Sequence, residues 1–275
     1  MKKQLAAAAL ALGLVLALAA SSAARDKDYG HWAAVNGHRM YYELRGAGRP
    51  LLLLHGGGSD IEDSFGKQLD PFALEHRIIA PEQVGQGHTP DVAGPLSYTK
   101  MTDDTAELLR QLHLSNVDVV GFSDGGILAL ILALRYPQLV RRLVITGANL
   151  DPSGLIDGDS QELTAPAPIA TDKPPQPMRA TDAAAPEIPV DDKLAQLWLH
   201  YPARDELNPE LLKSLHKRVL VMAGDQDEIK LVHTVLIFES LPEGQLCILP
   251  GTGHATFRER WQWVNPVVLS FLDQP

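Results

Sequence analysis

The chain has little cysteine and no cluster of basic residues. Cys247 is the only cysteine among 275 residues, so no disulfide can form within the chain. It lies in the apolar run QLCILP without a charged neighbour, which predicts a buried core thiol and not a nucleophile. Lysine and arginine form no run beyond the first three residues, and the formal net charge is −10. We therefore expect no nucleic acid partner.

Metal-binding spacings are absent as well. The sequence has no H-E-x-x-H motif and no paired Cys/His spacing, so we expect no metal and no cofactor. It has no internal repeat either. What remains is a chain with 45% hydrophobic residues, long enough for one sizeable domain with a real core.

The first 24 residues have the pattern of a secretory signal peptide. Two lysines precede a 16-residue apolar run that ends at Ala20. Ser22 and Ala24 then supply the small side chains that a signal peptidase needs at −3 and −1. An uncleaved anchor is the alternative, but the run is short for a membrane span. We expect cleavage of residues 1–24, no stable span afterwards, and a periplasmic or secreted protein.

After this segment, short apolar runs alternate with longer segments of helical period. The opening pair, HWAAV and RMYYEL, is joined by the tight-turn dipeptide Asn36-Gly37. Later runs end in LLLLHGGG, NVDVVG, VLVMAG and QLCILP, each separated from the next by a helical pattern or a loop. This alternation predicts an α/β fold, with a mostly parallel sheet and helices on both faces.

Residues 151–215 interrupt the alternation. Pro, Ala and Asp dominate from Thr164 to Asp192 and the apolar period is lost, which is typical of an irregular cover and not of a core. A disordered linker between two domains is the alternative, but the residues that follow are too few for a separate sheet. We expect a cap insertion, ending in the helix-forming KLAQLWLHYP, between two parts of one core, 25–150 and 216–275.

The stretch VVGFSDGGILALILAL places Ser123 between a predicted strand and a predicted helix. Gly121 and Gly125 stand two residues to either side, where small residues let the strand and helix backbones approach at a sharp turn. Such a turn strains the serine backbone, lifts its hydroxyl from the sheet and directs the helix N-terminus at developing charge. A glycine-rich turn with an incidental serine is the alternative. The strand–turn–helix context favours a nucleophile.

A serine nucleophile needs a base and an acid that orients the base. His254 follows a predicted strand through PGTG, at the end of the sheet where sites collect. The segment GDQDE ends the preceding strand and supplies Asp225, Asp227 and Glu228 as candidate acids. The order is then Ser, acidic residue, His.

Two backbone N–H groups are expected to bind an oxyanion. The glycines after the strand LLLL let a substrate oxygen come close to the backbone, and the N–H of Gly57 is the first expected donor. The second is the N–H of Asp124, the residue after the nucleophile. His55, before the glycines, is expected to be structural. The carboxylate of Asp124 has two interpretations. Either the helix dipole stabilises it at a helix start, or it receives a cationic amine of the substrate.

Four motifs, LLLLHGGG, GFSDGGILAL, GDQDE and PGTGH, together resemble the α/β-hydrolase superfamily in its single-domain, esterase-like branch. The stretch after Gly121 is similar to valacyclovir-hydrolase-like and carboxylesterase-like members. The resemblance covers residues 31–273 apart from the insertion. It implies that Asp227 is the acid of the triad and that Asp225 shapes the loop.

One loop departs from the family pattern. Members usually carry D-x-R-G-x-G-x-S after the fourth strand, whereas PEQVGQGHT has Glu82 and Val84 in place of the Asp and Arg. The family Arg commonly anchors this loop, so the departure leaves the loop's rigidity and the shape of the pocket open.

The resemblance implies a carboxylesterase-like serine hydrolase that cleaves small-molecule esters through an acyl-enzyme, and the signal pattern adds that it is exported. A carbon–carbon bond hydrolase or a perhydrolase of the same fold would share the triad of Ser123, His254 and Asp227. A non-catalytic binding protein is the remaining alternative, although such proteins usually lose a member of the triad. The sequence specifies neither the natural substrate nor the oligomeric state.

Overall fold

The computed structural model describes residues 29–156, 188–200 and 206–274. The predicted signal peptide lies outside the described residues, as do residues 157–187 and 201–205 of the predicted cap insertion.

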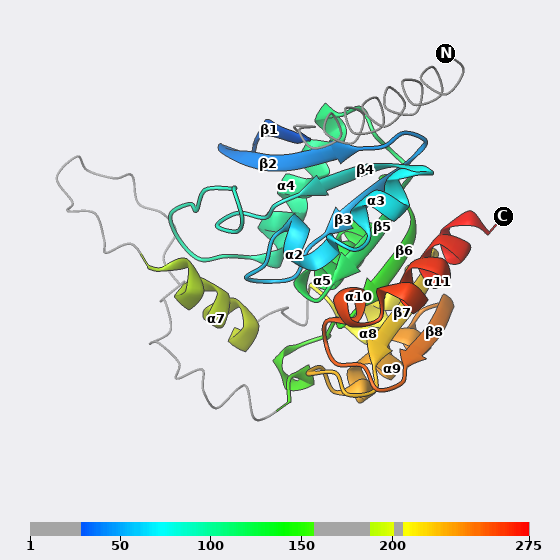
Figure 1. Ribbon diagram of the computed structural model, residues 1–275. Coiled ribbons are helices and arrows are strands. Elements are labelled where there is room, and N and C mark those ends of the chain that lie inside the picture. The colour runs from blue at the N-terminus through cyan, green and yellow to red at the C-terminus, as the bar shows by residue number, and fades with distance from the viewer. Residues whose placement is uncertain (1–28, 157–187, 201–205, 275) are drawn as a thin grey trace, which may run out of the picture. The chain divides into compact units, whose positions relative to one another are not determined.

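In the described part of the chain, eight strands form one sheet in the order β1-β2-β4-β3-β5-β6-β7-β8 (Figure 1). The first two strands form the expected hairpin, and both residues of its Asn36-Gly37 turn have positive φ, as a type I′ turn requires. β2 pairs with β4 in antiparallel fashion, and every later pair is parallel. The strands are β1 (Gly30–Val35), β2 (His38–Arg45), β3 (Arg49–Leu54), β4 (His76–Pro81), β5 (Val117–Phe122), β6 (Val140–Thr146), β7 (Arg218–Gly224) and β8 (Glu243–Leu249).

Helices cover both faces of the sheet, so the predicted fold class is confirmed. Successive residues of β3 alternate between two cores: Leu52 and Leu54 belong to one, Leu51 and Leu53 to the other, as the period of a strand requires. The first core is closed by α4 (Tyr98–Gln111), α5 (Asp124–Arg135) and α9 (Leu231–Ser240). The second is closed by α2 (Ile61–Phe65), α3 (Leu69–Ala73), α10 (Thr256–Glu259) and α11 (Trp261–Asp273).

Between β6 and β7, the residues that the structure describes form η1 (Pro152–Gly154), α7 (Val190–His200) and α8 (Pro209–Leu212). The helix expected from KLAQLWLHYP is α7, which buries Leu194 and Leu197 in the first core. Lys193 of α7 is also buried; its Nζ lies 2.7 Å from Asp91 Oδ2 and donates to the carbonyl of Val92 at 2.6 Å. A buried ammonium needs such partners, so α7 is fixed against the loop after β4.

Cys247 is less buried than the core thiol that the sequence predicts, although it packs against the second core. Cys247 lies on β8, which is the last strand of the sheet in the part of the chain that the structure describes and pairs there with β7 alone. The thiol is therefore half-buried against the second core. Its pKa is raised by partial burial, which disfavours the thiolate.

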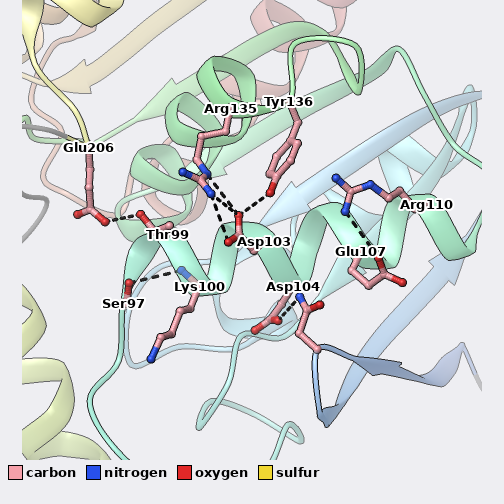
Figure 2. A network of polar contacts seen from close by, with 11 residues as sticks. Ser97, Thr99, Lys100, Asp103, Asp104, Glu107, Arg110, Arg135, Tyr136 and Glu206 are labelled. Carbon is pink, nitrogen blue, oxygen red and sulfur yellow. Dashed lines mark hydrogen bonds and ion pairs between the residues drawn. The ribbon is translucent and has the colours of Figure 1, made fainter. Parts of the chain in front are cut away.

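Polar contacts hold α4 between α5 and the opening hairpin (Figure 2). Asp103 accepts hydrogen bonds from Arg135 at 3.1 Å and from the Tyr136 hydroxyl at 2.7 Å, at the end of α5. Asp104 accepts from Asn36 Nδ2 of the hairpin turn at 2.8 Å. These contacts fix the helix whose first residue, Tyr98, points into the site described next.

Candidate active site

Ser123 stands at the junction of β5 and α5 in a strained backbone conformation. Its φ of 54° and ψ of −120° lie in a region that residues with a side chain seldom occupy, at a cost on the order of 1–3 kcal/mol. Its N–H donates to the carbonyl of Thr146 on β6 at 2.8 Å. The neighbouring strand therefore holds the strained turn in place.

The two glycines of the motif are required by close backbone contacts. A Cβ on Gly121 would lie 2.2 Å from the carbonyl oxygen of Gly125, and a Cβ on Gly125 would lie 1.9 Å from the carbonyl oxygen of Leu54. Both separations are far below van der Waals contact, and both involve backbone atoms that have no room to move. Strands β3 and β5 and helix α5 can meet here only because these positions carry no side chain.

The structure brings Ser123, His254 and Asp227 together at the carboxyl ends of parallel strands. Ser123 follows β5, Asp227 follows β7 and His254 follows β8, an arrangement typical of sites in such sheets. His254 Nε2 lies 2.9 Å from Ser123 Oγ, and His254 Nδ1 lies 2.6 Å from Asp227 Oδ1. Both distances are those of hydrogen bonds.

The protonation state of His254 follows from its partners. An ionised Asp227 can only accept, so the neutral ring carries its proton on Nδ1 and leaves Nε2 to accept from the serine hydroxyl. Burial lowers the pKa of His254, but the hydrogen bond and charge of Asp227, followed by the charges of Glu228 and Asp124, outweigh burial. The net pKa lies above the ordinary value, so the imidazolium is stabilised in this site.

Of the three candidate acids, Asp227 alone reaches the imidazole. Its Oδ1 also accepts from the N–H of Ile229 at 2.9 Å, which fixes the carboxylate. Asp225 Oδ1 instead accepts from the N–H of Thr252 at 3.2 Å. Thr252 belongs to the loop that leads to His254, so Asp225 ties the two loops together.

The two predicted oxyanion donors, Gly57 and Asp124, lie beside Ser123. Among three consecutive N–H groups after β3, that of Gly56 donates to Ser64 Oγ at 3.2 Å and that of Gly58 donates to Gln86 Oε1 at 2.8 Å. The N–H groups of Gly57 and of Asp124 make no hydrogen bond to any residue that the structure describes. Both are thus available to a substrate oxygen.

The carboxylate of Asp124 is buried and already paired. The Tyr98 hydroxyl donates to Oδ1 at 2.8 Å, and Trp198 Nε1 of α7 donates to Oδ2 at 3.0 Å. Burial raises the pKa of Asp124, against the lowering effect of the Trp198 and Tyr98 hydrogen bonds and of the His254 charge. Burial of Tyr98, together with the charge of Asp124, raises the pKa of the Tyr98 hydroxyl, which remains a neutral donor.

Sequence reasoning missed Tyr98 and Trp198. They come from α4 and α7, at 26 residues before and 74 residues after Asp124. Neither belongs to a motif, and an aromatic residue at a helical position is read first as core. The only available signal was Asp124 itself, because a carboxylate in an apolar setting requires donors.

The loop after β4, which departs from the family pattern, is organised by Glu82. The buried carboxylate accepts from the backbone N–H of His88, and its Oε2 lies 3.0 Å from His88 Nδ1. The Thr89 hydroxyl donates to the Glu82 carbonyl at 2.8 Å. A side chain from the start of the loop thus anchors its far end, in a chain that has Val84 where the family has arginine.

A comparison with models of protein families identifies the family of this chain. The model described as "Alpha/beta hydrolase family" matches residues 51–267, a span that includes Ser123, Asp227 and His254. The chain belongs to the alpha/beta hydrolase family. Its curated relatives include human "Serine hydrolase BPHL", which is 36% identical over 121 residues. The matched residues cover 42% of each chain. The chain matches only 42–44% of the length of the first three such relatives.

Matches over nearly the whole chain also exist within the family. The "2-hydroxymuconate semialdehyde hydrolase" of Pseudomonas putida is 29% identical over 264 residues, covering 86% of this chain and 91% of that one. Among solved structures, the meta-cleavage product hydrolase CumD of Pseudomonas fluorescens IP01 has a TM-score of 0.71 at 21% identity, covering 89% of this chain and 98% of CumD. At that identity, the structural likeness shows the alpha/beta hydrolase fold alone.

The described residues lack two other features. None of their helices has the length and apolar character needed to cross a bilayer. Nor do these residues contain a group of three or more His, Cys, Asp or Glu side chains placed to hold a metal ion.

Proposed function

We propose that the protein is a serine hydrolase that cleaves carboxylic esters of small molecules. The observation that carries the proposal is the continuous chain of contacts Ser123 Oγ, His254 Nε2, His254 Nδ1, Asp227 Oδ1, with separations of 2.9 and 2.6 Å across its two hydrogen bonds. This arrangement supplies a nucleophile, a general base and an orienting acid in contact range.

The proposed reaction has two halves. Ser123 Oγ attacks the ester carbonyl while His254 Nε2 takes the hydroxyl proton, and Asp227 stabilises the resulting imidazolium. The N–H groups of Gly57 and Asp124 bind the tetrahedral oxyanion. As this intermediate collapses, Nε2 returns the proton to the leaving alcohol. Water then attacks the acyl-enzyme, again through His254, and the carboxylic acid and free Ser123 are released.

Substitution of Ser123 by alanine tests the proposal. Ser123→Ala is expected to lower kcat for p-nitrophenyl esters by about a millionfold if the triad acts as a unit. A fluorophosphonate probe is expected to label the wild type at Ser123 and leave the variant unlabelled, while circular dichroism shows that both are folded. Failure to label the folded wild type would instead favour a non-catalytic binding protein.

A carbon–carbon bond hydrolase is the second candidate. It is supported by the Pseudomonas putida relative, which is named as a hydrolase of 2-hydroxymuconate semialdehyde and matches 86% of this chain. The same triad would serve that reaction. The ratio of kcat/KM for 2-hydroxymuconate semialdehyde to kcat/KM for a series of short to long acyl p-nitrophenyl esters decides between the two; we expect the esters to be preferred.

We further propose that the protein is exported after removal of residues 1–24. The proposal rests on the lysines, the apolar run and the small residues at the predicted cleavage site. N-terminal sequencing of the natively expressed protein is expected to begin at Arg25, in a periplasmic or culture fraction. An N-terminus at Met1 in the cytoplasmic fraction would overturn it.

A further inference from the structure

The oxyanion donor Gly57 lies between two peptide groups that are each held by a buried side chain. The peptide group before Gly57 joins the carbonyl of Gly56 to the N–H of Gly57, and the group after it ends in the N–H of Gly58. The Gly56 carbonyl accepts a hydrogen bond from the His55 ring, and the Gly58 N–H donates one to the Gln86 side chain. Of these two peptide groups, the one between Gly56 and Gly57 has its N–H available to a substrate, and His55 holds its carbonyl end.

His55 is oriented by the neighbouring loop. The N–H of Gln83 donates to His55 Nε2 at 2.9 Å, so Nδ1 carries the proton of the neutral ring and donates to the Gly56 carbonyl at 2.8 Å. The ring is 1% exposed, and this burial lowers the pKa of His55, more than the Gly56 contact and the Glu82 and Asp60 charges raise it. A neutral ring is the form that can accept from Gln83 and donate to Gly56 at once.

Gln86 holds the other side of Gly57. Its Oε1 accepts from the N–H of Gly58 at 2.8 Å, and the residue is 6% exposed. Gln86 lies in the loop that Glu82 organises through the N–H and ring of His88. The side chain therefore reaches Gly58 from a fixed base and not from a free surface loop.

The glycine loop packs directly on the nucleophile turn. A Cβ on Gly56 would lie 3.4 Å from Ser123 Cβ, and a Cβ on Gly57 would lie 2.2 Å from Asp124 Oδ2. The Gly57 N–H can be useful only in one orientation of its peptide group, because rotation of that group would turn a carbonyl oxygen toward the developing negative charge. Glycine itself offers no side chain to prevent the rotation.

We propose that His55 and Gln86 are positioning residues that fix the peptide groups on either side of Gly57, so that its N–H is aimed at the oxyanion before substrate binds. The inference rests on the proposed function and deepens it. Neither side chain touches the reacting atoms. They act through the glycine backbone, and a hydrogen bond to the Gly56 carbonyl also polarises the N–H at the other end of the same peptide group.

Gln86 provides a matched pair of variants. Gln86→Met keeps the length of the side chain but removes the acceptor, and Gln86→Glu keeps an acceptor oxygen at the same place. For a p-nitrophenyl ester we expect Gln86→Met to lower kcat about 10- to 100-fold with little change in KM, which is part of the effect of deleting an oxyanion donor. Gln86→Glu is expected to recover most of that loss.

His55 provides a second, independent pair. His55→Leu is expected to lower kcat in the same range. His76→Leu removes another imidazole with 1% exposure, at the start of β4 and away from the glycine loop, so it controls for the loss of a buried ring. Thermal unfolding is recorded for both variants, and kcat is measured well below each Tm, where a purely stabilising contact would leave it unchanged.

A second readout separates positioning from stability. A peptidyl or alkyl trifluoromethyl ketone forms a tetrahedral adduct with an oxyanion, whereas the alcohol product of the ester has no acyl oxygen. We expect Gln86→Met and His55→Leu to weaken binding of the ketone about as much as they lower kcat and to leave inhibition by the alcohol product unchanged. Wild-type kcat and ketone affinity in both variants would overturn the inference while Ser123 labelling upholds the proposed function; an unlabelled wild type would overturn both.

Discussion

The turn that carries Ser123 and the loop that carries Gly57 face the same reacting atoms but are fixed by different means. The Ser123 turn is determined by backbone contacts: Gly121 and Gly125 touch carbonyl oxygens, and the strained residue is bonded to β6. The Gly57 loop is held by hydrogen bonds to the loop after β4, in which the Gln86 side chain accepts from the Gly58 N–H and the Gln83 N–H donates to the His55 ring. One is a local steric fit and the other is a set of long-range hydrogen bonds.

The difference explains what each region tolerates. A steric fit to backbone admits one residue type, so it leaves a motif of fixed spacing in the sequence. A hydrogen bond from a distant loop admits any side chain that brings a suitable atom to the right place. Glu82 can therefore take over the anchoring of the loop in a chain with Val84 at the family's arginine position, as its bonds to His88 show.

The largest effect is expected at the steric contact. Gly125→Ala places a Cβ 1.9 Å from the Leu54 carbonyl oxygen, and should destabilise the fold by at least about 3 kcal/mol because backbone must move. Urea unfolding measures it. Gly126→Ala is the matched control. Its Cβ would lie 3.1 Å from the Ala148 side chain and at an ordinary contact distance of 3.5 Å from the Gly121 carbonyl oxygen and the Ile145 side chain, and it should change stability by about 1 kcal/mol or less. Equal losses in the two variants would contradict the steric explanation.

A smaller effect is expected at the side-chain anchor. Glu82→Gln replaces the carboxylate that receives both the N–H and the ring of His88, and should cost about 1–3 kcal/mol of stability. The same urea experiment on Glu75→Gln, at an exposed position, should show no change beyond about 0.5 kcal/mol. If Glu82→Gln were as stable as the wild type, the loop would have to be held by something other than Glu82.

The charge of Asp124 should show itself in the pH profile. Because that charge raises the pKa of His254, the base loses activity as pH falls through a value above about 6.5. Asp124→Asn is expected to move this acid limb of kcat/KM to lower pH. Since Tyr98 and Trp198 already occupy both oxygens, we expect kcat/KM for amino-acid esters and for neutral esters of the same leaving group to change by equal factors. A selective loss of amino-acid esters would assign the carboxylate to a substrate amine.

At high salt the smallest effect is expected from Glu228, which also raises the pKa of His254 but is exposed. Glu228→Gln should shift the acid limb in the same direction as Asp124→Asn, and its shift should vanish at high salt because exposed charges are screened. Glu243→Gln, on the exposed start of β8, is the control and should leave the profile in place. A salt-independent shift would mean that Glu228 acts by contact and not by charge.

The sequence predicted those features that depend on interactions between residues close together in the chain. Alternating apolar runs predicted the parallel sheet, the Asn36-Gly37 pair predicted the hairpin, and the glycine spacing around Ser123 matched a turn that the structure shows to be sterically determined. The placements of His254 and of the acidic segment GDQDE could be anticipated because chain order and strand ends limit where such residues can meet, whereas the choice of Asp227 within that segment came from the family resemblance.

Contacts between distant segments could not be predicted in this way. The pairing of Asp124 with Trp198 depends on how α7 packs, and the bond from Gln86 to Gly58 depends on the path of an eight-residue loop from Glu82 to Thr89. No local pattern encodes either. The partial exposure of Cys247 was not predicted for a related reason: an apolar run indicates a strand but does not indicate whether that strand ends the sheet.

The positive φ of Ser123 has a consequence for how this chain can change. Glycine adopts that backbone angle without penalty, so a chain with glycine at position 123 would relieve the strain while losing its hydroxyl. Selection for thermal stability alone would then favour variants without the hydroxyl, and selection for activity is what retains the serine. The reactive group is maintained at a cost to the fold, and robustness has to be gained at other positions.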